Sequence, residues 1–212
     1  VVMYHLHVRG FTKQKNSGVR HKGTFAGLRE KLPYLRELGI NQIRLMPVYD
    51  FAEMTPRLEL KGVPKTQKEA VVRAAERLPE EEAWRMNYWG YGPGFYFAPK
   101  ASYAASPDPD LELKQLIRAI HALGMELILE FPFTEDTDML LILECLRYWV
   151  QEYHVDGFVL MTRSTVCEEL ARLPMFRDVK LIGEWFPDGL VQKNAQMWHS
   201  RLAESNDGFM ND

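Results

Sequence analysis

Short apolar runs alternate along this chain with segments whose hydrophobic residues recur at helical spacing. The apolar runs lie at residues 1–8, 40–47, 125–131, 157–161 and 179–184. Continuous runs of this length are typical of buried parallel strands, and a strand, a helix and a strand in succession require a parallel sheet. We therefore expect an α/β fold. Periodicity alone leaves open whether it is a barrel or a doubly wound sheet.

Capping and turn residues indicate where the intervening helices begin and end. Thr24 is the expected N-cap of a helix that Gly39 stops, and Asp108 or Asp110 begins a helix that Gly124 stops. Further helices are expected from Thr137 to Val150, near Thr165–Leu173 and from Gly189 to Ala203, whereas Arg9 to Gly23 is expected to form a polar loop.

The alternation breaks between Val48 and Pro107. Residues 66–86 are rich in charged residues and have only a modest helical period, which favours a solvated excursion over a binding element. We interpret residues 52–86 as a charged insertion between the second strand and the next helix, and residues 1–212 as one domain that is part of a larger barrel.

Residues 87–103 combine seven aromatic residues with three glycines. This composition predicts a structured loop rather than a simple helix or strand. Some of the rings are expected to seal the top of the core. Exposed rings on a glycine-rich loop above a parallel sheet are also typical of a sugar-binding cleft, because the C–H faces of sugars stack on aromatic rings.

The overall composition excludes several classes of function. A formal charge of -3 gives no electrostatic reason to expect binding to nucleic acid or to an anionic membrane surface. No apolar run reaches the roughly 18 residues that span a bilayer. Cys145 and Cys167 lack metal-ligand spacing and are expected to be free thiols, so neither a metal nor another cofactor is expected. Both ends of the chain look like cuts, and we expect a fragment of a longer protein.

Six motifs occur in order along the chain. They are His5–Phe11, Gly23–Leu28, Leu45–Val48, Asn87–Tyr91, Tyr148–Val150 followed by Val155–Phe158, and Gly183–Trp185. Together they resemble the catalytic barrel of the α-amylase superfamily of glycoside hydrolases. The nearest branch is that of pullulanases, isoamylases and glycogen-debranching enzymes, which cut α-1,6 branch points. The resemblance implies a (β/α)8 TIM-type barrel truncated to roughly strands one to five, with strands six to eight beyond Asp212.

The resemblance also implies a retaining mechanism with two carboxylates, one a nucleophile on strand four and one a general acid/base on strand five. Glu184 matches the acid/base and is followed by Trp185, as the motif expects. The nucleophile position is Met161, because the motif Asp-Gly-Phe-Arg-x-Asp corresponds to residues 156–161. The arginine that orients the nucleophile corresponds to Val159. A third carboxylate, after strand seven, is expected beyond Asp212.

On strand three the motif Asp-x-x-x-Asn-His corresponds to residues 130–135, so that Glu135 stands where a histidine would contact the sugar. Methionine cannot form a glycosyl ester, and loss of a nucleophile typically costs several orders of magnitude in rate. Losing the nucleophile, the arginine and the histidine together predicts an inactive chain. Glu130 could face the same cleft as Glu184, or it could pair with a buried basic or backbone group. Glu135 could equally supply charge at a helix N-terminus.

By resemblance, Tyr91 is the ring that stacks on the sugar at the cleavage site, with Trp89 and Tyr88 in support. Trp185 and Glu130 complete the expected substrate-binding set. Structural or surface roles are expected for His5, His7, Arg9, His121, Asp156 and His199.

Two hypotheses follow. The chain is a debranching-type glycoside hydrolase domain that acts on α-glucans such as starch, glycogen or pullulan and is catalytically impaired at Met161. Alternatively, it is a non-catalytic pseudoenzyme that binds α-glucan or serves as a scaffold. The expected partners are an α-glucan, and either the rest of a parent chain or a second copy that covers the open edges of the barrel. A cytoplasmic location is favoured.

Overall fold

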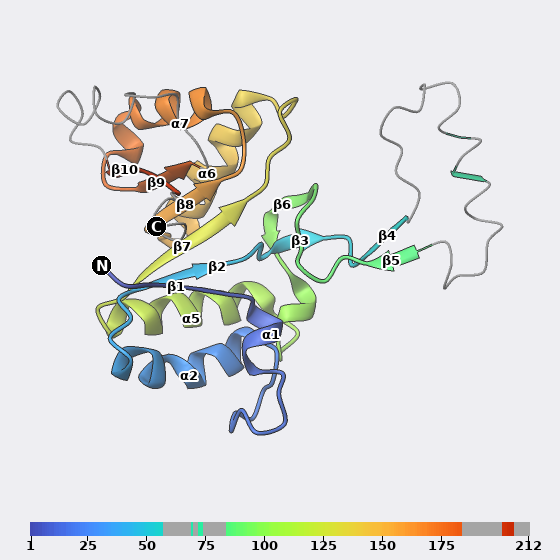
Figure 1. Ribbon diagram of the computed structural model, residues 1–212, viewed down its shortest axis with the longest axis vertical. Helices are drawn as coiled ribbons and strands as arrows, with labels where there is room; N and C mark the ends of the chain where they lie inside the picture. Colours follow the sequence, from blue (N-terminus) through green and yellow to red (C-terminus); the bar gives the residue numbers. More distant parts are fainter. Residues whose placement is uncertain (57–68, 70–71, 74–83, 184–200, 206–212) are drawn as a thin grey trace, which may run out of the picture.

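The computed structural model describes residues 1–56, 69, 72–73, 84–183 and 201–205. Its centre is a parallel sheet of six strands (Figure 1). In spatial order the strands are β1 (Met3–Leu6), β2 (Gln42–Leu45), β7 (Glu126–Phe131), β8 (Gly157–Leu160), β9 (Lys180–Gly183) and β10 (Arg201–Glu204). The strands predicted from the five apolar runs are all present, each within its run.

The order of the strands separates the two architectures that periodicity left open. Each strand of the sheet pairs with the one that precedes it in the chain, without a reversal of direction across the sheet. A doubly wound sheet reverses its strand order at a switch point, whereas a (β/α)8 barrel adds strands in one direction only. The described part of the chain therefore has the winding of a barrel.

The longer helices are α2 (Phe25–Glu37), α5 (Pro109–Ala122), α6 (Met139–Tyr153) and α7 (Ser164–Ala171). Apolar residues of all four helices belong to the same buried cluster as one face of the sheet, which contributes Leu45, Leu129, Phe131, Phe158, Leu160 and Leu181. The other face carries a separate, smaller apolar cluster of Ile128, Val159 and Ile182. One sheet face thus packs against helices and the other forms an interior, as in a barrel.

The helix ends follow the capping signals closely. The Thr24 hydroxyl accepts the N–H of Gly27, and the Asp108 carboxylate accepts that of Leu111. Gly39 and Gly124 follow their helices with positive φ, 80° and 67°. The helix expected from Thr137 begins two residues later, because Asp138 is the N-cap and the Thr137 hydroxyl bonds to that of Thr134 instead.

Three local predictions were wrong. Residues Arg201–Glu204 form the sixth strand instead of the end of a helix, because pairing with β9 overrides the high helix propensity of Arg, Leu, Ala and Glu. The remainder of that expected helix, from Gly189, lies outside the described residues. Strand six therefore precedes Asp212 instead of following it. Residues Val8–Thr12, expected as strand and loop, form the short helix α1, which His7 caps by accepting the Gly10 N–H.

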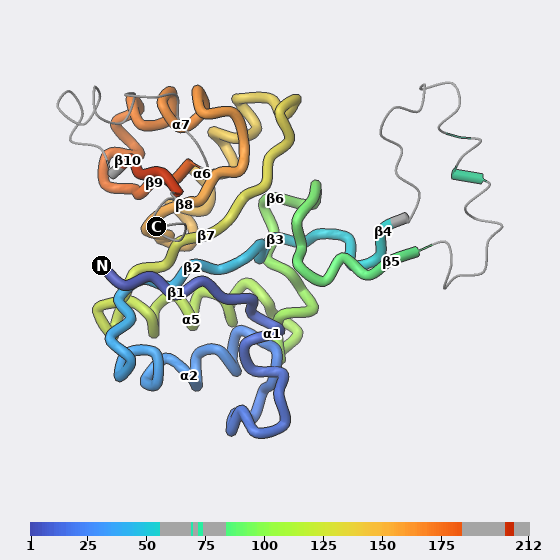
Figure 2. Tube along the Cα trace, viewed as in Figure 1, coloured from blue at the N-terminus to red at the C-terminus, as the bar shows by residue number. Residues whose placement is uncertain are grey.

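The third correction concerns the aromatic segment. It contains a strand, β6 (Gly94–Pro99), which pairs antiparallel with β3 (Tyr49–Phe51). A short 3-10 helix follows at Ala101–Tyr103. Outside this segment, a second 3-10 helix lies at Pro174–Phe176. A second antiparallel pair joins β4 (Met54–Pro56) to β5 (Trp84–Met86) and projects away from the sheet (Figure 2). Most of the charged insertion predicted at residues 52–86 lies outside the described residues.

The inner face of the sheet has three levels. Near the amino ends of the strands, Gln42 and Lys180 both donate hydrogen bonds to Glu126. The apolar cluster of Ile128, Val159 and Ile182 is buried in the middle. The carboxyl ends carry a second polar group of side chains, and this is the edge at which sites form in parallel α/β folds. None of the described helices is long and apolar enough to cross a membrane.

Candidate functional site

A buried carboxylate, that of Glu130, is the centre of the polar group at the carboxyl edge of the sheet. The side chain of Glu130 has no exposed surface. Its Oε1 accepts hydrogen bonds from the Arg44 guanidinium, through Nε, and from Nε2 of His5 at 2.7 Å. Its Oε2 accepts the hydroxyl of Tyr91 at 2.5 Å. Strands β1, β2 and β7 and the loop that carries Tyr91 therefore converge on one anion.

The electrostatics favour the ionised form of this carboxylate. Burial by itself raises the pKa of Glu130, but the hydrogen bonds from His5 and Tyr91 and the charge of Arg44 outweigh burial and lower the pKa below its usual range. Of the two interpretations of Glu130, pairing with a basic group is borne out by the contact with Arg44, although the side chain of Arg44 is only partly buried. Direct contact between Glu130 and a substrate stays a prediction.

Sequence reasoning missed Arg44. Its signal was a charge between two apolar residues of one strand, Ile43 and Leu45, which both point into the helix-facing core. Because side chains alternate along a strand, a charge flanked by two core residues has to point to the inner face. His5, which the sequence assigned a structural role, joins the same cluster from β1.

The strand that the motifs match to the nucleophile carries no charge on its inner face. Val159 is fully buried and packs with Ile128 and Ile182. It is the register partner of Glu130 on β7, so an apolar side chain stands beside the buried carboxylate on that flank. Met161 follows the strand, is partly exposed, and donates its backbone N–H to the Phe131 carbonyl at 3.1 Å.

Glu135, a further position of the predicted catalytic set, is not brought to this cluster. Glu135 is exposed, ahead of helix α6. Glu184 and Trp185 lie outside the described residues. No group of three His, Cys, Asp or Glu side chains that could hold a metal occurs in the part of the chain that the structure describes. Cys145 and Cys167 are buried free thiols.

Three of the four predicted aromatic residues of the binding set, Tyr88, Trp89 and Tyr91, lie in one loop, and two of them are exposed. Trp89 is 53% exposed and Tyr91 37%. Tyr88 stacks on the His7 ring at 4.6 Å and meets the Trp89 ring edge-on at 5.0 Å. Gly90 has a φ of 82°, and a Cβ there would run into the Phe51 ring. Only glycine therefore fits between Trp89 and Tyr91.

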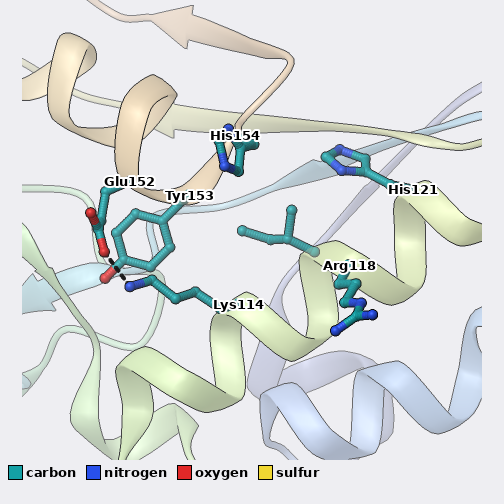
Figure 3. A pocket seen from close by; sticks show the side chains of 7 residues that line it. Lys114, Arg118, His121, Glu152, Tyr153 and His154 are labelled. Carbon is teal, nitrogen blue, oxygen red and sulfur yellow. Dashed lines mark hydrogen bonds and ion pairs between the residues drawn. The ribbon is translucent and has the colours of Figure 1, made fainter.

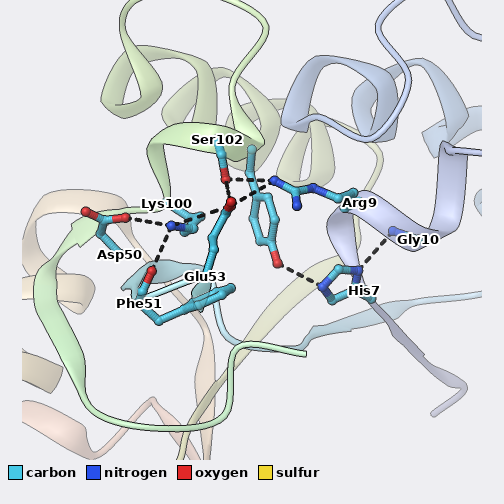
Figure 4. Close-up of polar contacts among 9 residues, drawn as sticks. His7, Arg9, Gly10, Asp50, Phe51, Glu53, Lys100 and Ser102 are labelled. Carbon is cyan, nitrogen blue, oxygen red and sulfur yellow. Dashed lines mark hydrogen bonds and ion pairs between the residues drawn. The ribbon is translucent and has the colours of Figure 1, made fainter. Parts of the chain in front are cut away.

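A polar network beneath this aromatic segment fixes its position (Figure 4). Nδ1 of His7 accepts the Gly10 N–H at 2.9 Å, so in the neutral ring Nε2 carries the proton and lies 2.8 Å from the Tyr103 hydroxyl. Burial lowers the pKa of His7, which keeps the ring neutral. The structural role expected of His7 is thereby confirmed.

Glu53 is the second node of the network in Figure 4. It accepts hydrogen bonds from Arg9, at 2.9 Å, and from Ser102. The Ser102 hydroxyl, together with Arg9, lowers the pKa of Glu53. The buried ammonium of Lys100 bonds to Asp50 at 3.0 Å. These contacts tie α1 to β3 and β6, and neither Glu53 nor Lys100 stood out in the sequence.

A cavity of about 380 Å³ lies on the opposite side of the fold, between α5 and α6 (Figure 3). Several of the polar side chains around it pair with one another or with neighbours, since Lys114 bonds to Asp110 and Glu152, and His121 lies 2.8 Å from Asp156. Asp156 also accepts the Leu127 N–H, which confirms its structural role. The exposed position expected of His121 is confirmed. The carboxyl edge of the sheet remains the better candidate.

Comparison with known proteins gives a consistent result. No family model matches the chain. It is similar to the chloroplastic isoamylase 3 of Oryza sativa subsp. japonica, with 28% identity across 100% of this chain and 33% of the relative. The glycogen operon protein GlgX homolog of Haemophilus influenzae is 26% identical across 100% of this chain and 38% of its own length. The chain therefore spans roughly a third of these relatives.

Among solved structures, the pullulanase of Paenibacillus barengoltzii in complex with maltohexaose and α-cyclodextrin superposes with a TM-score of 0.66. The sequence identity is 25%, across 98% of this chain and 39% of the pullulanase.

Proposed function

The chain belongs to the α-amylase superfamily, in the branch of isoamylases, pullulanases and glycogen debranching enzymes, and on that premise we propose that it binds α-glucans without hydrolysing them. Binding uses the exposed rings of Tyr91 and Trp89. Hydrolysis of the debranching type is lost because a methionine, Met161, stands at the nucleophile position.

The proposal of α-glucan binding rests on the aromatic segment. Tyr91 and Trp89 present ring surface at the carboxyl edge of the sheet, and a network of hydrogen bonds holds their loop in place. Sugars bind proteins by stacking C–H faces on such rings. The similar pullulanase is in complex with maltohexaose and α-cyclodextrin, both of them α-glucans.

The proposal that hydrolysis is lost rests on one observation above all. Val159 is fully buried in an apolar cluster with Ile128 and Ile182, at the position of the motif's arginine. The side chain at this position is therefore apolar and cannot supply the charge by which the motif's arginine orients the nucleophile. With a thioether two positions later, β8 offers neither a nucleophile nor a group to orient one.

Calorimetric titration of the full chain with maltohexaose tests the proposal. The wild-type chain is expected to bind maltohexaose and α-cyclodextrin but not cellohexaose, which presents β-linked glucose. Tyr91→Ala is expected to weaken binding by about tenfold, the effect of losing one ring stack of about 1.4 kcal/mol. Tyr91→Phe keeps the ring and should lose less.

Tyr34→Ala provides the matched control, because Tyr34 is an exposed tyrosine on α2, on the helical side of the sheet. It is expected to leave the affinity unchanged. Binding that is equal in wild type and Tyr91→Ala would overturn the assigned role of the ring. The absence of any binding to either α-glucan would overturn the proposed function itself.

A further inference from the structure

The buried carboxylate of Glu130 receives its positive charge from an unexpected strand. The matched motif carries an arginine at position 159, on β8 next to Glu130, and that position is an apolar valine here. The guanidinium that reaches Glu130 comes instead from Arg44 on β2, on the other flank of β7. The two strands lie on either side of the carboxylate in the same sheet.

The contacts of Glu130 link this charge to the aromatic segment. Arg44 and His5 bond to Oε1, and the Tyr91 hydroxyl bonds to Oε2. The Tyr91 hydroxyl donates a stronger hydrogen bond to an ionised carboxylate than to a protonated carboxyl group, which keeps only part of its capacity to accept. The position of the Tyr91 ring therefore depends on the charge of Arg44, which lies on β2, two strands away from β8.

We propose that Arg44 is the positioning residue of the candidate site: it acts through Glu130 to fix the hydroxyl and the ring of Tyr91, and supplies from β2 the positive charge that the motif carries on β8. The consequence for sugar affinity rests on the proposed function. The consequence for Glu130 and Tyr91 does not.

The geometry indicates that the positive charge beside Glu130 has moved from position 159 to position 44, and that the charge has not simply been lost. An uncompensated buried carboxylate is strongly unfavourable, yet the side chain of Glu130 is wholly buried and both of its oxygens have donors. The side chain of Arg44 is 17% exposed, so its charge reaches the carboxylate from the rim of the interior. Loss of the charge at 159 is thus matched by a charge at 44.

Nuclear magnetic resonance titration of the Glu130 carboxyl carbon and the Tyr91 ring tests the proposal without any sugar. The groups that face Glu130 are His5, Arg44 and Tyr91, and its neighbour on β8 is Val159. Arg44→Met is expected to raise the pKa of Glu130 by at least about one unit, because a neighbouring opposite charge lowers a carboxyl pKa by roughly 1–3 units. It should also shift the Tyr91 ring signals.

Arg44→Lys keeps the charge and is expected to keep both signals close to wild type, which a purely steric role of the side chain would not do. Unchanged titration of Glu130 and unchanged Tyr91 signals in Arg44→Met would overturn the proposal. So would Arg44→Lys behaving like Arg44→Met.

Returning the charge to β8 is a second test. Val159→Arg in the Arg44→Met background is expected to bring the Glu130 titration back toward wild type. A folded double variant in which Glu130 still titrates as in Arg44→Met would contradict the exchange. Should the larger side chain prevent folding, the comparison of Arg44→Lys with Arg44→Met decides.

Affinity for maltohexaose then separates this inference from the proposed function. Arg44→Met and Tyr91→Ala are expected to be non-additive, because one acts through the other. The double variant should be no more than about twofold weaker than Tyr91→Ala alone. Additive losses would overturn the link to Tyr91. If the wild-type chain binds no α-glucan, the proposed function fails, and the titration of Glu130 still tests Arg44.

Discussion

Replacing Phe131 with alanine is expected to lower the free energy of unfolding by about 4 kcal/mol, within the range of about 3–5 kcal/mol for large core aromatics. The Phe131 ring is fully buried at the end of β7. It stacks on Tyr49 at 5.5 Å and on Phe133 at 5.4 Å, and meets Trp149 edge-on at 5.9 Å. Alanine leaves a cavity that elements from β3 to α6 would have to collapse into.

Urea unfolding followed by tryptophan fluorescence measures this loss. Phe95→Ala is the matched control, because Phe95 is 76% exposed and its removal creates no cavity, so that a change within about 0.5 kcal/mol is expected. Equal stability of Phe131→Ala and Phe95→Ala would contradict the assignment of Phe131 to the centre of the core. The loss expected for Phe131→Ala is a large fraction of the free energy of unfolding of a whole domain, typically about 5–15 kcal/mol.

The second large effect is expected at Glu130. Glu130→Gln keeps the shape of the side chain but leaves Arg44 without its anion, and breaking a buried ion pair costs about 3–5 kcal/mol. Because the side chain of Arg44 is 17% exposed, water relieves part of this cost, and about 3 kcal/mol is expected at pH 7. Glu135→Gln, at an exposed carboxylate, should change stability by less than about 0.5 kcal/mol.

The pH dependence of this difference has a definite sign. The folded state lowers the pKa of Glu130, so its contribution is fully present above the unfolded value of about 4.3 and is lost as the pH falls through the folded value. The gap between wild type and Glu130→Gln should therefore be constant above about pH 5 and shrink below about pH 4. A gap that widens toward acid pH would contradict the ion pair.

The central sheet was largely predictable because local patterns determine it. The runs around Ile43, Ile128 and Phe158 are rich in apolar residues, and residues such as Thr24 and Gly39 mark helix ends through contacts with near neighbours. Strand β10 was missed because four residues of mixed polarity carry no clear period. Only its pairing with β9 makes it a strand.

The charge network of the site could not be derived in the same way. Arg44, Glu130 and Tyr91 are brought together by strand register and by a loop, across sequence separations of 86 and 39 residues. The motif match predicted where charge was missing, at Val159 and Met161. It did not predict that a neighbouring strand supplies a charge in its place, because that depends on which faces of β2 and β7 point inward.

Release of reducing ends from pullulan by the full chain measures whether hydrolysis is lost with Met161 at the nucleophile position. In a preparation that binds maltohexaose, turnover is expected to be at least about 10⁴-fold below that of a pullulanase assayed in parallel, the loss typical of an absent nucleophile. Release of reducing ends that Glu184→Gln abolishes would contradict it, because the acid/base position would then be carrying out the chemistry despite Met161.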